Sequence, residues 1–266
     1  MRIIIASPSY WPSQDGVTII TSYLAEGLAA RGHEVMVLTS AGNGGLQELP
    51  HREIHGGVDI ARMRIYVQWP LVIKGRDKES TKQAYLHYIE QNKPDALIVV
   101  CSQTWTLDWL LSDLKKITCA KIFYSHGYSA WKEKYPFGEQ IKRRNILGVW
   151  SLLKNKWYYD KLYQKIAMFD RAIYLSEENN SALYAQKYGL TNGRVLKNAI
   201  DDCFFEPQMQ HTYENKKTLR FLFVANYNDN KNQKSLIEVF AKADIGKSQL
   251  VLVGFEENAY SDMLKQ

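Results

Sequence analysis

Three residues lie in the polar loops that follow apolar runs, where an α/β sheet places its ligand-binding and catalytic residues. His126 follows the run Lys121–Tyr124 and is next to a glycine, so its imidazole can donate to a ligand oxygen without hindrance. Gly16 precedes a helical pattern, and the free amides of a helix start favour an anion. Lys231 follows another apolar run at a helix start, which suits a diphosphate. A tight turn, a hydrogen-bonded loop histidine and a solvated lysine are the corresponding structural explanations.

A basic segment rich in aromatic residues, Lys132–Lys165, is a further candidate for function. It holds nine Lys or Arg and three Asp or Glu, and its net charge of +6 equals that of the whole chain. A helical face with tryptophans and flanking cations can lie on an anionic membrane, or it can pack on the core with its charges solvated. No recognised nucleic-acid motif accompanies it, which argues against nucleic acid as a partner. The residues of this candidate membrane patch are Lys142, Arg143, Arg144, Trp150 and Trp157.

The composition, 45% apolar and 23% charged, is typical of a globular protein. The cysteines Cys101, Cys119 and Cys203 are odd in number and form no CxxC or Cys/His cluster, so we expect buried, reduced thiols and no metal site. The apolar run at the N-terminus, Ile3–Ala6, is too short for a signal peptide, and no apolar run approaches the length of a membrane span. We expect a cytoplasmic protein, with a peripheral location on the inner face of the membrane left open.

Strand and helix patterns alternate along the chain, which predicts an α/β fold with doubly wound parallel sheets. Ile3–Ala6 and Glu34–Leu38 flank a helical pattern that Gly32 ends, and together they form a right-handed βαβ unit. Further strands are expected at Val58–Met63, Ala96–Val100, Ala120–Tyr124, Asp170–Leu175 and Arg194–Leu196, and helices at Val17–Arg31, Glu79–Gln91, Leu107–Leu114 and Glu177–Tyr188.

The chain is predicted to hold one long domain and the beginning of a second. Residues 1–200 form the N-terminal Rossmann-like domain, and the polar stretch 201–218, which contains a proline, is the expected linker. Residues 219–266 contain a strand, a polar turn with a lysine, an amphipathic helix and another strand, which is the opening of a nucleotide-binding domain. We expect the chain to stop within that second domain and the short segment to be mobile or to lean on another surface.

Five segments, in order along the chain, resemble the retaining GT-B glycosyltransferases of the group 1 or family 4 type. They are SYWPSQDGVTIITSYLAEGLAARGHEVMVLT, YSHGY, FDRAIYLSEENNSALYAQKYGL, RVLKNAIDDCFF and FLFVANYNDNKNQKSLIEVF. The resemblance spans nearly the whole chain. It implies an acceptor-side Rossmann-like domain followed by the first part of a donor-binding domain.

The resemblance also implies roles for matching residues. His126 would be the catalytic-site residue that contacts the transferred sugar near the reacting carbon. Gly16 would approach the donor phosphates or the acceptor, and Lys231 would bind the donor diphosphate and stabilise the leaving group as charge develops. Asn198 and Asp201 would shape the hinge between the domains.

The chain departs from the family's pattern at several positions. Asp15 replaces the first of two glycines, and Ala199 replaces the glycine of the hinge. Asn226 stands in the phosphate-binding position where a basic residue is usual, so one phosphate contact is lost. The paired-glutamate motif of the family lies further along, and Glu256 and Glu257 are not its equivalent.

The leading hypothesis is therefore a retaining transfer of a hexose from a nucleotide-diphosphate sugar, with UDP or GDP, to a glycan or lipid-linked acceptor in cell-surface polysaccharide synthesis. No metal or covalent cofactor is expected, and the short chain is expected to be poorly active alone. The alternative is a non-catalytic acceptor-binding or scaffold subunit that acts at a membrane or with a partner, as an oligomer in one version. A dinucleotide-binding oxidoreductase is the weakest hypothesis, because no GxGxxG is present.

Overall fold

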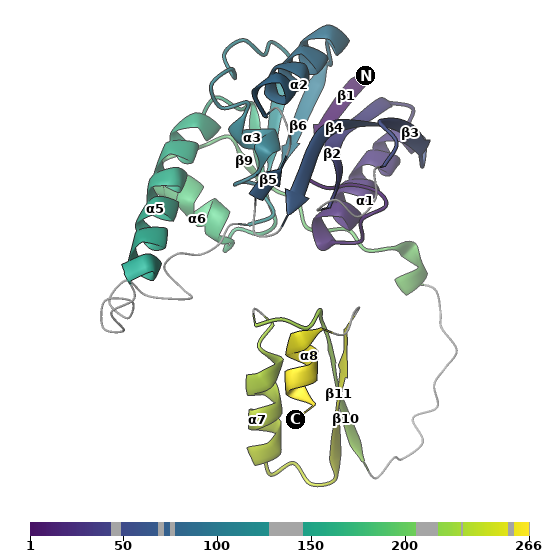
Figure 1. Cartoon of the computed structure of the whole chain (residues 1–266), viewed down its shortest axis with the longest axis vertical. Coiled ribbons are helices and arrows are strands. Elements are labelled where there is room, and N and C mark those ends of the chain that lie inside the picture. Colours follow the sequence, from purple (N-terminus) through teal and green to yellow (C-terminus); the bar gives the residue numbers. More distant parts are fainter. Residues whose placement is uncertain are drawn as a thin grey trace. The chain divides into compact units, whose positions relative to one another are not determined.

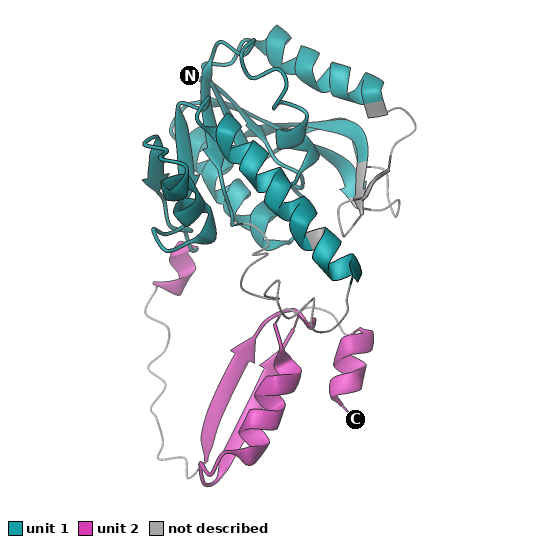
Figure 2. Cartoon of the chain, turned by 90° about the vertical axis from the view of Figure 1, so that its left-hand side faces the viewer, with its two compact units in different colours: residues 1–200 teal, residues 201–266 magenta. Residues whose placement is uncertain are grey.

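The computed structural model describes residues 1–43, 49–68, 72–74, 78–127, 146–205, 218–229, 231–254 and 258–265. The chain divides into two compact units, Met1–Ile200 and Asp201–Gln266 (Figure 2). Lys142, Arg143 and Arg144 of the candidate membrane patch lie outside the described residues, as do Glu256 and Glu257.

Unit 1 is built on a nine-stranded, mainly parallel sheet, which confirms the expected fold class. Its order is β3-β4-β2-β1-β6-β7-β8-β9, with β5 paired to β4, and only β3 and β5 run antiparallel to their neighbour β4. The strands are β1 (Arg2–Ala6), β2 (Glu34–Asn43), β3 (Arg52–His55), β4 (Val58–Gln68), β5 (Val72–Lys74), β6 (Ala96–Val100), β7 (Ala120–Tyr124), β8 (Arg171–Tyr174) and β9 (Gly193–Val195).

Helices cover both faces of this sheet, since each buried strand alternates its apolar side chains between two core layers. Helix α1 (Gly16–Ala30) packs on one face, against residues such as Ile5 and Val37. The other face, with Leu97 and Phe123, is covered by four helices (Figure 1). They are α2 (Lys78–Asn92), α3 (Trp105–Asp108), α5 (Ile146–Ile166) and α6 (Asn180–Lys187).

One expectation about local structure was wrong, and one element was not predicted. A helix was expected at Leu107–Leu114, but the helix in this region, α3, has only four residues and ends at Asp108. Turns follow it, with hydrogen bonds between residues three apart, such as that from the Asp113 N–H to the Leu110 carbonyl. The hairpin β3–β4 was missed. Its turn is Gly56-Gly57, where both residues have positive φ, 57° and 76°, as a two-residue hairpin loop requires.

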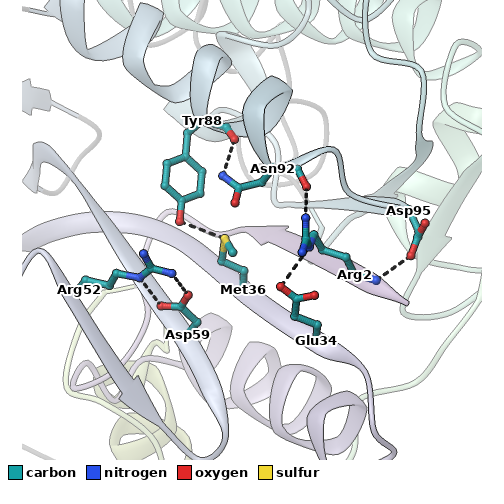
Figure 3. Close-up of polar contacts among 8 residues, drawn as sticks. All are labelled: Arg2, Glu34, Met36, Arg52, Asp59, Tyr88, Asn92 and Asp95. Carbon is teal, nitrogen blue, oxygen red and sulfur yellow. Dashed lines mark hydrogen bonds and ion pairs between the residues drawn. The ribbon is translucent and has the colours of Figure 1, made fainter.

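The amino ends of the strands are fixed by Arg2 at the start of β1 (Figure 3). Its backbone N–H donates to Asp95 Oδ2 (2.7 Å), its Nε to Glu34 Oε1 (3.0 Å) and its Nη1 to the Asn92 carbonyl (2.9 Å). One residue thus joins β1 to β2 and to the turn between α2 and β6. The same view shows two further pairs, Tyr88 with Met36 and Arg52 with Asp59.

Unit 2 contains a short helical turn, η1 (Asp202–Phe204), and a two-stranded parallel sheet of β10 (Leu219–Val224) and β11 (Ser248–Val253). Helix α7 (Gln233–Lys242) packs on one face, where the rings of Phe221 and Phe240 lie 5.6 Å apart. Helix α8 (Ala259–Leu264) follows, with a capping box formed by Asn258 and Ser261. The strand–helix–strand order expected from the sequence is present.

Candidate functional site

The candidate residues of unit 1 lie at the carboxyl edge of its sheet. β1 and β6 are neighbours, but the chain leaves β1 for α1 on one face and leaves β6 for α3 on the other. Such a switch of direction opens a crevice at which ligands of parallel sheets bind. The loops after β1, β6 and β7 meet there and carry Asp15, Cys101 and His126.

Asp15 is the N-cap of α1 and is the residue that sequence reasoning undervalued. Its Oδ1 accepts from the backbone N–H groups of Val17 and Thr18, both at 3.0 Å. Its Oδ2 accepts from the hydroxyls of Ser9, Ser13 and Thr18, each at 2.9 Å. Partial burial opposes ionisation, but these hydrogen bonds outweigh it and lower the pKa of Asp15 below its ordinary value. Two amides of this helix start are therefore already bound to a fixed carboxylate.

Gly16 itself has open space beside it, because a Cβ added there would meet no protein atom within 4 Å. Its assignment to the donor phosphates stays a prediction. The negative charge of Asp15 next to it opposes a phosphate at this position, whereas sugar hydroxyls carry no charge to repel.

His126 follows β7 and has an unusual environment. Its ring centroid lies 4.5 Å from that of Tyr124, and its Nε2 is buried with no hydrogen-bond partner among the described residues. Burial lowers the pKa of His126 to about 4, and the charge of Asp15 opposes that shift in part. The imidazole is therefore neutral near pH 7, with one ring nitrogen available to a ligand. Burial also raises the pKa of the neighbouring Cys101 thiol to about 12, so that this group is not an ionised nucleophile.

The loop that carries His126 is anchored to α6. Ser125 Oγ donates to Ser181 Oγ at 2.7 Å in the interior, and the Gly127 N–H donates to Ser125 Oγ at 3.3 Å. Gly127 has φ of 94°, which a side chain would strain. Asn179 caps α6 by accepting from the Ser181 N–H at 2.8 Å. The glycine beside the histidine, noted in the sequence, is thus needed for the backbone turn.

The loop after β6 is held in a strained conformation by α5. Cys101 and Gln103 both have positive φ, 67° and 56°, without being glycine. The Gln103 N–H donates to the Tyr158 hydroxyl (2.8 Å), which donates in turn to Asp108 Oδ1 (2.6 Å). The Gln103 side chain also reaches Asn155 Oδ1 at 3.2 Å. These partners are 50 or more positions apart in the sequence, so no local pattern predicted them.

A buried arginine holds the loop after β1 from the side. Arg62 of β4 has a fully buried side chain, which pairs with Glu53 and donates to the carbonyl of Trp11 at 2.6 Å and to that of Pro50 at 2.9 Å. The Trp11 ring stacks on His55 at 3.9 Å between centroids. The hairpin β3–β4 therefore helps to set the shape of the loop that ends at Asp15.

The candidate phosphate residues of unit 2 lie after β10. Lys231 is exposed, with no ion-pair partner in the part of unit 2 that the structure describes, and it stands two residues before α7. Asn232, the N-cap, makes no side-chain capping bond, so α7 lacks the bound carboxylate that α1 has. Asn226 is fixed by its carbonyl, which accepts from the buried Gln233 side chain at 2.9 Å.

The two residues predicted to shape the hinge lie near the boundary between the units. Asn198 is exposed, and Asp201 caps η1 by accepting from the Cys203 N–H at 2.9 Å, a bond that lowers the pKa of Asp201. Cys203 is exposed, so the expectation that all three thiols are buried was wrong for it.

Trp150 and Trp157 of the candidate membrane patch lie on α5, and each is 64% exposed. Among the residues that the structure describes, no three His, Cys, Asp or Glu side chains are grouped to hold a metal ion. None of the described helices combines the length and apolarity needed to cross a membrane. A depression of about 850 Å³, lined by Lys93, Asp95 and Cys119 among others, lies at the amino edge of the sheet, away from these candidates.

Comparison with known proteins identifies the family. The model of Glycosyltransferase Family 4 matches residues 14–202, which is most of the chain and includes the loop of Asp15, His126 and the hinge. The chain belongs to glycosyltransferase family 4. Among curated proteins, no sequence matches it.

Solved glycosyltransferase structures share its fold. Sucrose-phosphate synthase from Thermosynechococcus elongatus has 18% identity and a TM-score of 0.65, covering 98% of this chain and 64% of its own. HepE from Anabaena, solved with UDP, has 13% identity and a TM-score of 0.56, covering 100% of this chain and 65% of its own. WaaG, a glycosyltransferase involved in lipopolysaccharide biosynthesis, has 13% identity and a TM-score of 0.56, covering 98% of this chain and 66% of its own. The family 4 chain thus spans less than two thirds of the length of each, and the expected GT-B fold class is confirmed.

Proposed function

We propose that this family 4 chain takes part in the transfer of a hexose from a nucleotide-diphosphate sugar to a glycan or lipid-linked acceptor, with retention of configuration. Unit 1 binds the acceptor at the carboxyl edge of its sheet, and unit 2 binds the donor. HepE, solved with UDP, supports a UDP sugar as donor, with GDP as the alternative. Free thiols at all three cysteines are compatible with a protein that functions in the reducing environment of the cytoplasm.

The observation that carries the proposal is the contrast between the two helices that follow the first strand of each unit. The start of α1 holds its own carboxylate, Asp15, which accepts two of its amides. The start of α7 has no carboxylate cap and has the cation of Lys231 beside it. A diphosphate, with its two or more negative charges, is repelled at the first site and attracted at the second.

His126 then acts on the sugar rather than on phosphate. A neutral imidazole whose buried Nε2 has no partner among the described residues can accept or donate one hydrogen bond to a sugar hydroxyl, depending on its tautomer. A hydrogen bond made in a site shielded from water discriminates strongly against a substrate that lacks the hydroxyl. Lys231 places its charge where the diphosphate leaving group develops negative charge, a contact that strengthens in the transition state.

The test measures binding of inorganic pyrophosphate and of UDP-glucose to the full chain by ³¹P NMR or calorimetry. Lys231→Ala is expected to weaken pyrophosphate binding by about tenfold, the value of one charge-assisted hydrogen bond. Lys247→Ala, which removes an exposed lysine at the other end of the unit 2 sheet, serves as the matched control. Equal affinities for wild type and Lys231→Ala refute the assignment. Acceptor binding without any sugar transfer from UDP or GDP donors would favour the scaffold alternative.

A further inference from the structure

The outward-facing side of α5 is apolar over more than two turns. Its side chains recur at three- and four-residue spacing, so they share one face of the helix. The opposite face is buried in the core through Tyr159, Leu162 and Tyr163. Trp150 and Trp157 at 64% exposure, and Ile146 at 81%, are far more open than large apolar side chains in a protein interior. We call this surface the outer face of α5; its apolar members are Ile146, Leu147, Trp150, Leu153 and Trp157.

Lysines continue the same face. Lys154, Lys161 and Lys165 follow Trp150 and Trp157 at four-residue steps, and all three are exposed. Lys154 Nζ lies 5.5 Å from the centroid of the Trp150 ring, within cation–π range. The outer face therefore pairs bulky apolar groups with positive charge.

The only acidic residue of α5 does not offset that charge. Asp160 is bound at the flank of the helix, where it pairs with Lys156 and accepts from the Tyr188 hydroxyl. Partial burial opposes ionisation of the Asp160 carboxylate, but the hydrogen bonds from Lys156 and Tyr188 and the nearby lysine charges lower its pKa. Asp160 borders the outer face by its spacing from Leu153 and Trp157, but its carboxylate is held by Lys156 and Tyr188 and so does not face the exposed lysines.

Charge decides which occupant fits this face. A second copy of the chain, packed symmetrically, would bring the same lysines against one another. The stretch 218–266 holds six basic and six acidic side chains, so it offers no net negative charge to complement them. An anionic bilayer supplies an apolar layer for the tryptophans and negative headgroups for the lysines. We propose that the outer face of α5 docks on the surface of an anionic lipid bilayer.

The position of this face ties the bilayer to the candidate site, a step that rests on the proposed function. Asn155 and Tyr158 of α5 hold Gln103, at the carboxyl edge of the sheet. The first turns of α5, which precede Asn155, therefore extend past that edge of the sheet (Figure 1). A bilayer on the outer face brings lipid headgroups to the edge at which the acceptor binds. The acceptor class is then a lipid-linked glycan and not a free one.

The test is co-sedimentation of the full chain with vesicles of phosphatidylglycerol and phosphatidylcholine, and with vesicles of phosphatidylcholine alone. Lys154→Glu/Lys161→Glu/Lys165→Glu is expected to lower the partition coefficient on anionic vesicles by about 100-fold or more, since each lysine contributes about fivefold. Trp150→Ala/Trp157→Ala is expected to lower it by about tenfold or more, because both rings leave the interface. Circular dichroism checks that each variant is folded.

Two matched controls remove general effects. Lys93→Glu/Lys115→Glu/Arg171→Glu changes the net charge by the same amount at the amino edge, and Ile54→Ala removes another exposed apolar side chain. Both are expected to bind far better than the outer-face variants. Equal losses in the two charge-reversal variants, or wild-type binding by the tryptophan variant, overturn the proposal. The proposal is also overturned if the wild type does not bind vesicles but forms a dimer, and the tryptophan variant is monomeric. Pyrophosphate binding at Lys231 is a separate measurement, so either proposal can fail alone.

Discussion

Replacing Asp15 tests how the start of α1 is built. Asp15→Ala removes an N-cap, worth about 1 kcal/mol, and three hydroxyl bonds to a charged acceptor. Because the side chain is partly exposed to solvent, screening reduces each hydroxyl bond to about 0.3 kcal/mol, so that the three together contribute about 1 kcal/mol. The expected loss in the free energy of unfolding is about 2 kcal/mol. Asn179→Ala, a cap with one backbone bond and no hydroxyl donors, is the control and should lose about 1 kcal/mol.

The pH dependence separates the charge from the cap. Asp15→Asn keeps an oxygen for the backbone amides but removes the charge. The folded pKa of Asp15 is depressed, so its stabilisation is complete above the unfolded pKa, about 4, and is lost as the pH falls through the folded pKa. The difference between wild type and Asp15→Asn should therefore be constant from pH 7 to 5 and shrink below about pH 4.

Urea unfolding followed by tryptophan fluorescence measures both effects. All seven tryptophans precede residue 200, so the signal reports unit 1 and not unit 2. Wild-type stability in Asp15→Ala would refute the capping argument. A difference between wild type and Asp15→Asn that grows on acidification would refute the sign of the linkage.

Two further predictions concern His126 and Gly254. Burial lowers the pKa of the His126 imidazole to about 4, so the ring should stay neutral at pH 6 in ¹⁵N NMR. As the pH falls, the imidazole of the unfolded chain takes up a proton before the folded one does. The contribution of His126 to stability is therefore complete above about pH 6.5 and declines toward pH 4. A titration midpoint near the ordinary value would contradict this. Gly254→Ala would put a Cβ 2.4 Å from the Tyr227 ring and should destabilise unit 2 by about 1–3 kcal/mol, seen as faster amide exchange in β10 and β11. Unchanged exchange there would rule it out, and Gly16→Ala, with open space beside it, is the control.

The sequence predicted the framework because its signals are local. Apolar runs such as Ile3–Ala6 and Ala96–Val100 became β1 and β6, buried on both faces as parallel strands are. The helix after Asp15 and its stop at Gly32, with φ of 83°, were also readable from a short window. The strand β3 was not, since the sequence Arg-Glu-Ile-His has a single apolar residue and pairs by its backbone with β4.

The candidate site was only partly predictable. His126 could be placed at a strand end, but its buried Nε2 and the influence of Asp15 depend on contacts across the sheet. Asp15 carried a usable signal, an N-cap residue directly before a helical pattern, which the comparison with the family's glycine obscured. The bonds of Gln103 to Tyr158 and of Ser125 to Ser181 span 55 and 56 positions, beyond any spacing rule.

The buried guanidinium of Arg62 couples the peripheral hairpin β3–β4 to the loop after β1. Arg62 bonds to the carbonyls of Trp11 and Pro50 and forms an ion pair with Glu53. These contacts link the loop after β1 to the outer strands β3 and β4, so that they are expected to move together. A change in the hairpin would therefore shift the segment that leads to Asp15 without replacing any residue of that segment. The hairpin can therefore vary at a distance from His126 and still change the shape of the first loop, and a substitution of Arg62 requires a matching one at Glu53, its ion-pair partner.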